Sequence, residues 1–153
     1  MSDHVILLVE DNASDEELTL RAFRKSHIAN KVVVVRDGAE ALDFLFARGA
    51  YATRDADDLP QLVLLDLNLP KVSGLDVLRA IRADERTQLL PIVILTSSKE
   101  DKDLLEGYTA GANSYIVKPV DFTQFAEAVR QLGMYWLVLN QGAPTRLERG
   151  SAE

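Results

Sequence analysis

Cysteine is absent from this sequence of 153 residues. Its absence excludes disulfide bonds and thiolate metal sites and is typical of a reducing compartment, so we expect a cytoplasmic protein. No cluster of lysine and arginine is present and the formal net charge is −7, which argues against direct binding of nucleic acid. The longest apolar segment of the C-terminal part, Leu132 to Leu139, is far shorter than the ~20 residues that span a bilayer. No basic segment precedes the apolar run that begins at Val5, which argues against a signal peptide.

The length suits one domain with a hydrophobic core, which we place at residues 1–140, followed by a polar tail at 141–153. Short apolar runs alternate five times with segments whose apolar residues recur at helical spacing. The runs predict strands at Val5–Val9, Val32–Val35, Leu62–Leu65, Pro91–Leu95 and Tyr115–Val117. This alternation predicts an α/β fold with one doubly wound, five-stranded parallel sheet and five helices, the last of them extended.

The helices and one loop are expected at definite places. Ser14 and Glu17 have the spacing of a capping box, which predicts a helix over about Ser14–Ser26 with Leu18 and Ala22 on one side. The segment Gly49–Leu59 is polar and has no period, so we expect an exposed loop there.

Groups that carry chemistry follow the predicted strands. Glu10 and Asp11 follow the first strand, Asp66 the central one, Thr96 the fourth and Lys118 the fifth. The carboxyl ends of parallel strands meet at one edge of a sheet. In the flavodoxin-like strand order 2-1-3-4-5, the first and third strands are neighbours and a crevice opens between them. The three carboxylates are therefore expected to lie close together.

Carboxylates gathered in this way repel one another. At ~5 Å and an effective dielectric constant of ~20, each pair costs roughly 3 kcal/mol. Either one acid is protonated or a divalent cation is bound. The ligands are hard oxygens, which favours Mg²⁺ held by Glu10, Asp11 and Asp66, with a further oxygen from the backbone carbonyl of Asn68.

The other two groups suit a phosphoryl group. Lys118 is a cation that can pair with a phosphate oxygen, and Thr96 offers a hydroxyl donor. A carboxylate can accept a phosphoryl group and form an acyl phosphate. The residues therefore support the hypothesis that Asp66 attacks a phosphoryl donor, that Mg²⁺ and Lys118 stabilise the product, and that Thr96 senses it.

These motifs, in this order, resemble the receiver domain of two-component response regulators over about residues 4–135. The matching stretches are Val-Glu10-Asp11-Asn, Leu-Leu-Asp66-Leu-Asn-Leu-Pro70, Thr96-Ser97 and Tyr115-Ile-Val-Lys118-Pro119. The resemblance implies that Asp66 is the phosphoacceptor, that Asp11 binds Mg²⁺ directly and that Glu10 acts through water. It also implies a cis Lys118–Pro119 peptide and a switch pair of Thr96 and Tyr115. Asn68 and Ser98 lie where the family tunes the lifetime of the acyl phosphate.

Residues 105–122, the 49–59 segment and the apolar last helix look more specifically like the stand-alone response regulators of bacterial phytochromes. That resemblance implies a sensor histidine kinase, a phytochrome, as partner. The family also implies docking of the kinase near Asp15 and Leu18. The last helix carries more apolar residues than one domain can cover, which predicts a homodimer. The expected dimer face consists of Phe122, Phe125, Tyr135, Trp136, Val138 and Leu139.

Several alternatives remain open at this point. Asp66 could be the nucleophile of a Mg²⁺-dependent phosphohydrolase, although Asn68 then stands where such enzymes often have a second acid. A flavodoxin-like module for a nucleotide or flavin would want a phosphate loop after the first strand, where Glu10 and Asp11 stand instead. The chain could also serve a kinase that is not a photoreceptor, or be a receiver locked in one state. Tyr115 could be a plain core aromatic residue.

Overall fold

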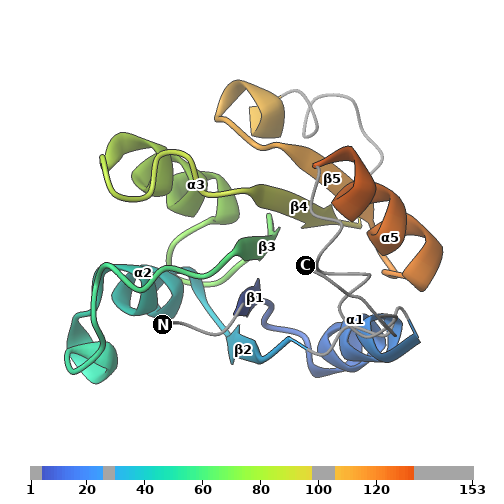
Figure 1. Cartoon of the computed structure of the whole chain (residues 1–153), viewed down its shortest axis with the longest axis horizontal. Helices are drawn as coiled ribbons and strands as arrows, with labels where there is room; N and C mark the ends of the chain where they lie inside the picture. Colours follow the sequence, from blue (N-terminus) through green and yellow to red (C-terminus); the bar gives the residue numbers. More distant parts are fainter. Residues whose placement is uncertain (1–4, 26–29, 98–105, 133–153) are drawn as a thin grey trace, which may run out of the picture.

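One parallel sheet of five strands forms the centre of the molecule, in the order β2-β1-β3-β4-β5 (Figure 1). The structure is a computed structural model that describes residues 5–25, 30–97 and 106–132. The strands are β1 (Ile6–Val9), β2 (Val32–Val35), β3 (Leu62–Asp66), β4 (Ile92–Thr96) and β5 (Ser114–Val117). All neighbouring strands are parallel. The predicted doubly wound α/β fold and its strand order are confirmed.

Helices cover both faces of the sheet (Figure 1). They are α1 (Ala13–Lys25), α2 (Gly38–Phe46), α3 (Gly74–Ala83) and α5 (Phe122–Gln131), together with a helical segment at residues 106–109. Helices α1 and α5 lie on one face, and α2 and α3 on the other. The predicted extension of the last helix, with Tyr135, Trp136, Val138 and Leu139, lies outside the described residues. Within the described ranges, no helix is both long enough and apolar enough to cross a membrane.

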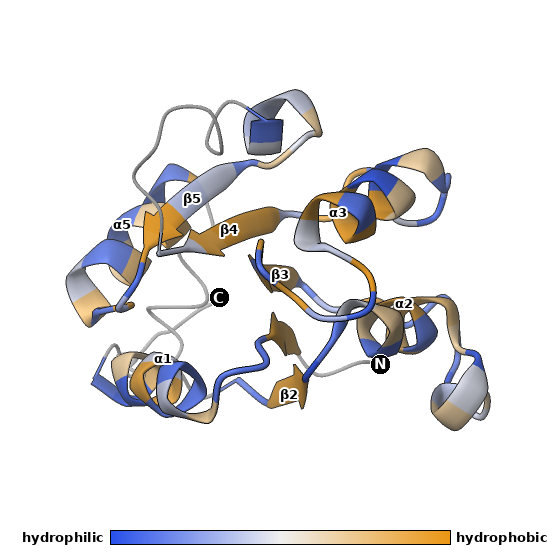
Figure 2. Cartoon of the chain, turned by 180° about the vertical axis from the view of Figure 1, so that it is seen from behind, coloured by the Kyte–Doolittle hydropathy of each residue, from blue (hydrophilic) through white to orange (hydrophobic). Residues whose placement is uncertain are grey.

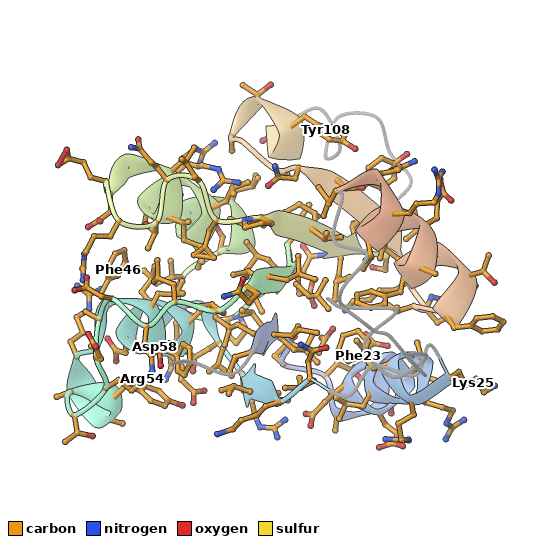
Figure 3. All side chains as sticks on the ribbon, in the orientation of Figure 1. Phe23, Lys25, Phe46, Arg54, Asp58 and Tyr108 are labelled. Carbon is orange, nitrogen blue, oxygen red and sulfur yellow. The ribbon has the colours of Figure 1, made fainter. Side chains whose placement is uncertain are left out.

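Alternation along the strands divides the core into two layers, because successive side chains of a strand point to opposite faces. One layer packs Ile6, Leu8 and their neighbours against α1 and α5, where the rings of Phe23 and Phe125 lie 4.6 Å apart. Figure 3 shows Phe23 reaching from α1 into this layer. The other layer packs Leu7 and its neighbours against α2 and α3. Figure 2 shows that β4 is hydrophobic along most of its length, and β1, β3 and β4 are buried throughout because helices cover both faces of the sheet.

The start of α1 differs from the prediction. The helix begins at Ala13, and Oδ1 of Asn12 accepts a hydrogen bond of 2.9 Å from the backbone N–H of Asp15. Asn12 is therefore the capping residue, and the predicted capping box of Ser14 is wrong. The buried residues of this helix are Thr19, Ala22 and Phe23, while Leu18 is partly exposed. Leu18 and Ala22 lie on one side of the helix, as predicted, with Ala22 buried and Leu18 at the exposed edge of that side.

Residues 49–59 are more ordered than a plain exposed loop. They begin with the short 3-10 helix η1 (Gly49–Tyr51), and two of their side chains are attached to α2. The hydroxyl of Tyr51 donates a hydrogen bond of 2.6 Å to Glu40, and the guanidinium of Arg54 lies 3.8 Å from the centre of the Phe44 ring. Arg54 also donates to the carbonyl oxygens of Phe44 and Asp58 (Figure 3). Polar side chains therefore hold this segment, which is why its sequence shows no apolar period.

Gly74 allows the chain that follows β3 to pack closely. A Cβ at this position would lie 2.3 Å from the carbonyl oxygen of Asp66 and 2.6 Å from Cα of Leu67. Both atoms belong to the backbone and cannot move aside cheaply. The N–H of Gly74 also donates to the carbonyl of Leu67 at 3.1 Å. The first turn of α3 therefore rests on the end of β3.

Gly74→Ala should destabilise the protein, because the added methyl group has to displace backbone. We expect the free energy of unfolding to fall by about 1–3 kcal/mol, measured by urea denaturation. Gly107→Ala is the matched control, since its Cβ would meet only a side-chain atom of Ile94 at 3.7 Å. The control should stay within about 1 kcal/mol of the wild type. Equal stability of all three proteins would contradict the close packing inferred at Gly74.

Candidate functional site

Three carboxylates meet at the carboxyl edge of the sheet. β1 and β3 pair in the register Val9↔Leu65, so Glu10 and Asp66 follow at the same level on neighbouring strands. One carboxylate oxygen from each of Glu10, Asp11 and Asp66 lies within 4.8 Å of the others. Glu10 and Asp66 are buried and Asp11 is exposed. The predicted convergence of these three side chains is confirmed.

Lys118 brings a cation to the same place. It follows β5, and its backbone N–H donates to the carbonyl of Thr96 at 2.8 Å. Its ammonium Nζ lies 2.8 Å from Oδ2 of Asp66 and 2.8 Å from Oε1 of Glu10. The contact with Asp66 is a hydrogen bond, whereas Oε1 of Glu10 forms an ion pair without hydrogen-bond geometry. The Lys118–Pro119 peptide is cis, as the resemblance implied.

Asp15 is a member of the site that sequence reasoning missed. Its Oδ2 accepts a hydrogen bond of 2.9 Å from Nζ of Lys118. Asp15 lies in the first turn of α1, and the predicted start of this helix at Ser14 did not show where that turn points. The available signal was Asn12, a strong capping residue directly after the acid pair, which places the first turn of the helix at the edge of the sheet.

Asp66 is held by groups on both of its oxygens. Oδ1 accepts a hydrogen bond of 2.9 Å from the backbone N–H of Asn68, and Oδ2 accepts from Lys118. The carboxylate is thereby fixed in orientation at the end of a rigid strand. The predicted role of the Asn68 carbonyl as a metal ligand stays a prediction, and Ser98 lies outside the described residues.

The site has an excess of negative charge. Four carboxylates, those of Glu10, Asp11, Asp15 and Asp66, share this edge with the ammonium of Lys118. Burial raises the pKa of Glu10 to about 7; Lys118 opposes the rise and Asp66 adds to it. Burial by itself disfavours the charge of Lys118, but the nearby carboxylates of Asp66, Glu10 and Asp15 outweigh it and hold the pKa of Lys118 above the usual range.

These residues fit a divalent cation. Carboxylate oxygens are the hard ligands that Mg²⁺ and Mn²⁺ prefer, and three of them already lie close enough together to share one ion. Oε1 of Glu10 is buried and lacks a hydrogen bond. A cation with retained water would satisfy that oxygen and offset the repulsion between the acids.

Thr96 and Tyr115 lie on the same face of the sheet. Tyr115 pairs with Ile94 in the β4–β5 register, and Thr96 stands two residues further along β4. Thr96 is buried, whereas Tyr115 is 38% exposed and packs edge-to-face against Tyr108 at 5.7 Å. The alternative of a core aromatic residue at position 115 is therefore wrong. The action of the pair as a switch stays a prediction.

The expected dimer face needs one correction. Phe125 is 0% exposed and packs against Phe23 in the core, so it is not available to a second molecule. It lies on the inner stripe of α5, three residues after Phe122, where Ala128 and Val129 are also buried. Phe122 is 49% exposed and remains on the surface.

Glu10 should make the stability of the metal-free protein depend on pH. Its pKa rises from 4.5 to about 7 on folding, so the folded state binds this proton more tightly than the unfolded chain. The stability from this group is complete below its unfolded pKa and is lost as the pH rises through about 7. Glu10→Gln removes this loss. In EDTA its advantage in unfolding free energy should grow by on the order of 2 kcal/mol between about pH 5 and about pH 8.

Chemical denaturation at several pH values measures this difference. The exposed Glu85 offers a control, because Glu85→Gln changes the net charge equally outside the site. The control should follow the wild type at every pH. A constant difference between Glu10→Gln and the wild type would show that Glu10 does not titrate in this range.

The chain matches a known protein family and is similar in sequence to proteins of known name. The family model of the response regulator receiver domain matches residues 6–130. The probable methanogenesis regulatory protein FilR2 of Methanothrix harundinacea is 40% identical over 137 residues, which is 90% of this chain and 86% of FilR2. The response regulator Rcp1 of Synechocystis is 35% identical over 133 residues, which is 87% of this chain and 88% of Rcp1.

Solved structures agree with these sequence matches. The bacteriophytochrome response regulator RtBRR is 48% identical, with a TM-score of 0.83 over 94% of this chain and 86% of its own. A Mn(2+)-bound form of Rcp1 is 32% identical, with a TM-score of 0.72 over 95% of this chain and 99% of its own.

Proposed function

Because the chain belongs to the response regulator receiver domain family, we propose that it is a cytoplasmic response regulator whose Asp66 accepts a phosphoryl group from a sensor histidine kinase. The observation that supports this most directly is the carboxylate of Asp66, held between Lys118 and the N–H of Asn68 beside two further acids. The chain covers 86% of FilR2 and 88% of Rcp1, which supports a receiver domain at residues 1–140. Response regulators of this family are generally signalling proteins rather than enzymes.

The proposed step is a phosphoryl transfer. An oxygen of Asp66 attacks the phosphorus of a phosphohistidine, a P–O bond forms, and the P–N bond breaks with its electron pair passing to the imidazole nitrogen. Lys118 pairs with an oxygen of the transferred group, and the Thr96 hydroxyl donates to another. A bound Mg²⁺, for which Glu10, Asp11, Asp66 and the Asn68 carbonyl are the candidate ligands, would supply neutralisation of charge on the phosphoryl oxygens.

The signal would leave through the surface near β5. When the phosphoryl group draws the Thr96 hydroxyl towards it, space opens on the face of the sheet that Thr96 shares with Tyr115. Tyr115 would then rotate inward from its exposed position against Tyr108. A partner protein that binds this surface would find Tyr115 in a different position in the phosphorylated and the unphosphorylated protein.

The kinase partner that we favour is a phytochrome. The support is the similarity to RtBRR, a bacteriophytochrome response regulator, at 48% identity. FilR2, a methanogenesis regulator at 40% identity, supports the alternative of a kinase that is not a photoreceptor. Transfer from a purified phosphorylated phytochrome, compared with transfer from an unrelated histidine kinase, separates the two. Equal rates from both kinases would argue against phytochrome specificity.

Phosphorylation of Asp66 can be tested with a small donor. With Mg²⁺ and acetyl phosphate, intact-mass spectrometry should show one phosphoryl adduct, lost in Asp66→Asn and in EDTA. Asp76→Asn is the control, because the side chain of this exposed residue of α3 pairs with Arg79 and not with the site, so the substitution should leave the adduct intact. Sustained hydrolysis of many phosphate esters without an adduct would favour a phosphohydrolase. An adduct that survives in Asp66→Asn would exclude Asp66 as acceptor.

We also propose a homodimer through the last helix and its neighbours. Phe122 is exposed, and the apolar residues that follow in sequence, Tyr135, Trp136, Val138 and Leu139, lie outside the described residues. Light scattering should give a dimer for the full chain and a monomer after truncation behind Leu132. The same oligomeric state for both proteins would contradict this proposal.

A further inference from the structure

The ammonium of Lys118 is surrounded by three carboxylates from separate segments. Nζ lies 2.8 Å from Glu10, 2.8 Å from Asp66 and 2.9 Å from Asp15. An ammonium has three N–H donors, and two of them are directed at Asp66 and Asp15. The oxygen of Glu10 lies as close to Nζ as that of Asp66, so three carboxylates enclose the ammonium and a phosphoryl oxygen that pairs with Lys118 has to displace one of them.

Burial decides which acid can leave. The side chain of Glu10 is 0% exposed and that of Asp66 is 6% exposed, whereas that of Asp15 is 32% exposed. Separating a buried carboxylate from its cation leaves an unpaired charge inside the protein, which is strongly unfavourable. Asp15 can exchange Lys118 for water at much lower cost. It is therefore the partner that gives way.

The backbone holds Asp15 at the mouth of the site. Its N–H is capped by Asn12, and the next residue, Glu16, forms an ion pair with Arg36 just beyond β2. These two contacts hold the backbone of the first turn of α1 in place. Rotation of the Asp15 side chain alone is therefore enough to break or re-form its hydrogen bond with Lys118. A released Asp15 would remain on the first turn of α1 beside the site, where its negative charge would repel the oxygens of an incoming phosphoryl group.

From this geometry we propose that Asp15 is a positioning residue that occupies Lys118 in the unphosphorylated protein and restrains phosphorylation. The inference rests on the proposed role of Asp66 as acceptor. It assigns Asp15 an effect on the reaction that acts through Lys118 and through repulsion of the phosphoryl oxygens. Removal of its charge should therefore speed phosphorylation, whereas loss of a purely structural contact would slow it or leave it unchanged.

Asp15→Asn keeps the size of the side chain and an acceptor oxygen but removes the charge. At saturating Mg²⁺ we expect the rate of adduct formation from acetyl phosphate to rise roughly two- to fivefold, the range of a partly exposed ion pair. Beryllium fluoride, which mimics the phosphoryl group without transfer, should bind more tightly by a similar factor. Asp15→Glu restores the charge and should return both values towards those of the wild type.

Glu17→Gln is the matched control. Glu17 lies on the same helix and pairs with Arg21 and Arg24, so the substitution changes the net charge equally without touching Lys118. It should leave the rate and the beryllium fluoride affinity unchanged. An equal gain in this control would assign the effect to overall charge and overturn the proposal.

Two further results separate this inference from the proposed function. A wild-type adduct on Asp66 with an unchanged or slower rate in Asp15→Asn overturns the role of Asp15 alone. Absence of any adduct in the wild type and in Asp15→Asn overturns both.

Discussion

The ammonium group of Lys118 links the acidic segments that form the candidate site. Lys118 follows the fifth strand, yet its partners come from the end of the first strand, the end of the third and the first turn of α1. Without a cation, buried carboxylates at these distances would repel one another by several kcal/mol. The sheet positions the strand ends, and the positive charge of Lys118 offsets the repulsion between the carboxylates that they carry.

The same site accounts for the charge behaviour of the protein. Burial shifts Glu10 towards its protonated form, while three acids stabilise the charged form of Lys118. These opposing effects of burial and charge leave the acids under mutual repulsion, which a divalent cation would reduce. A site of this kind is suited to respond to ligands, because ligand binding would relieve the electrostatic repulsion that remains between the acids in the folded protein.

Rigid surroundings fix the geometry of this site. Asp66 ends a fully buried strand, Gly74 lets α3 rest against the end of that strand, and the Asn68 N–H orients the carboxylate. On the next strands, buried Thr96 and exposed Tyr115 share one face of the sheet. In the proposed switch, the path from Asp66 to the surface would run through these two adjacent strands.

Apolar runs and helical periodicity were sufficient to predict the parallel sheet with helices on both faces, because these features follow from local pattern. The meeting of Glu10, Asp11 and Asp66 was predicted on the premise of the flavodoxin-like strand order, which local pattern does not determine. Only the tertiary structure decided that Asp15 reaches Lys118, that Phe125 belongs to the core, that Tyr115 faces outward, and that Tyr51 and Arg54 attach residues 49–59 to α2. The physical reason is that these outcomes depend on the exact start and rotation of a helix or on contacts between distant side chains. A shift of one residue turns a helical side chain by about 100°, and sequence pattern does not resolve that shift.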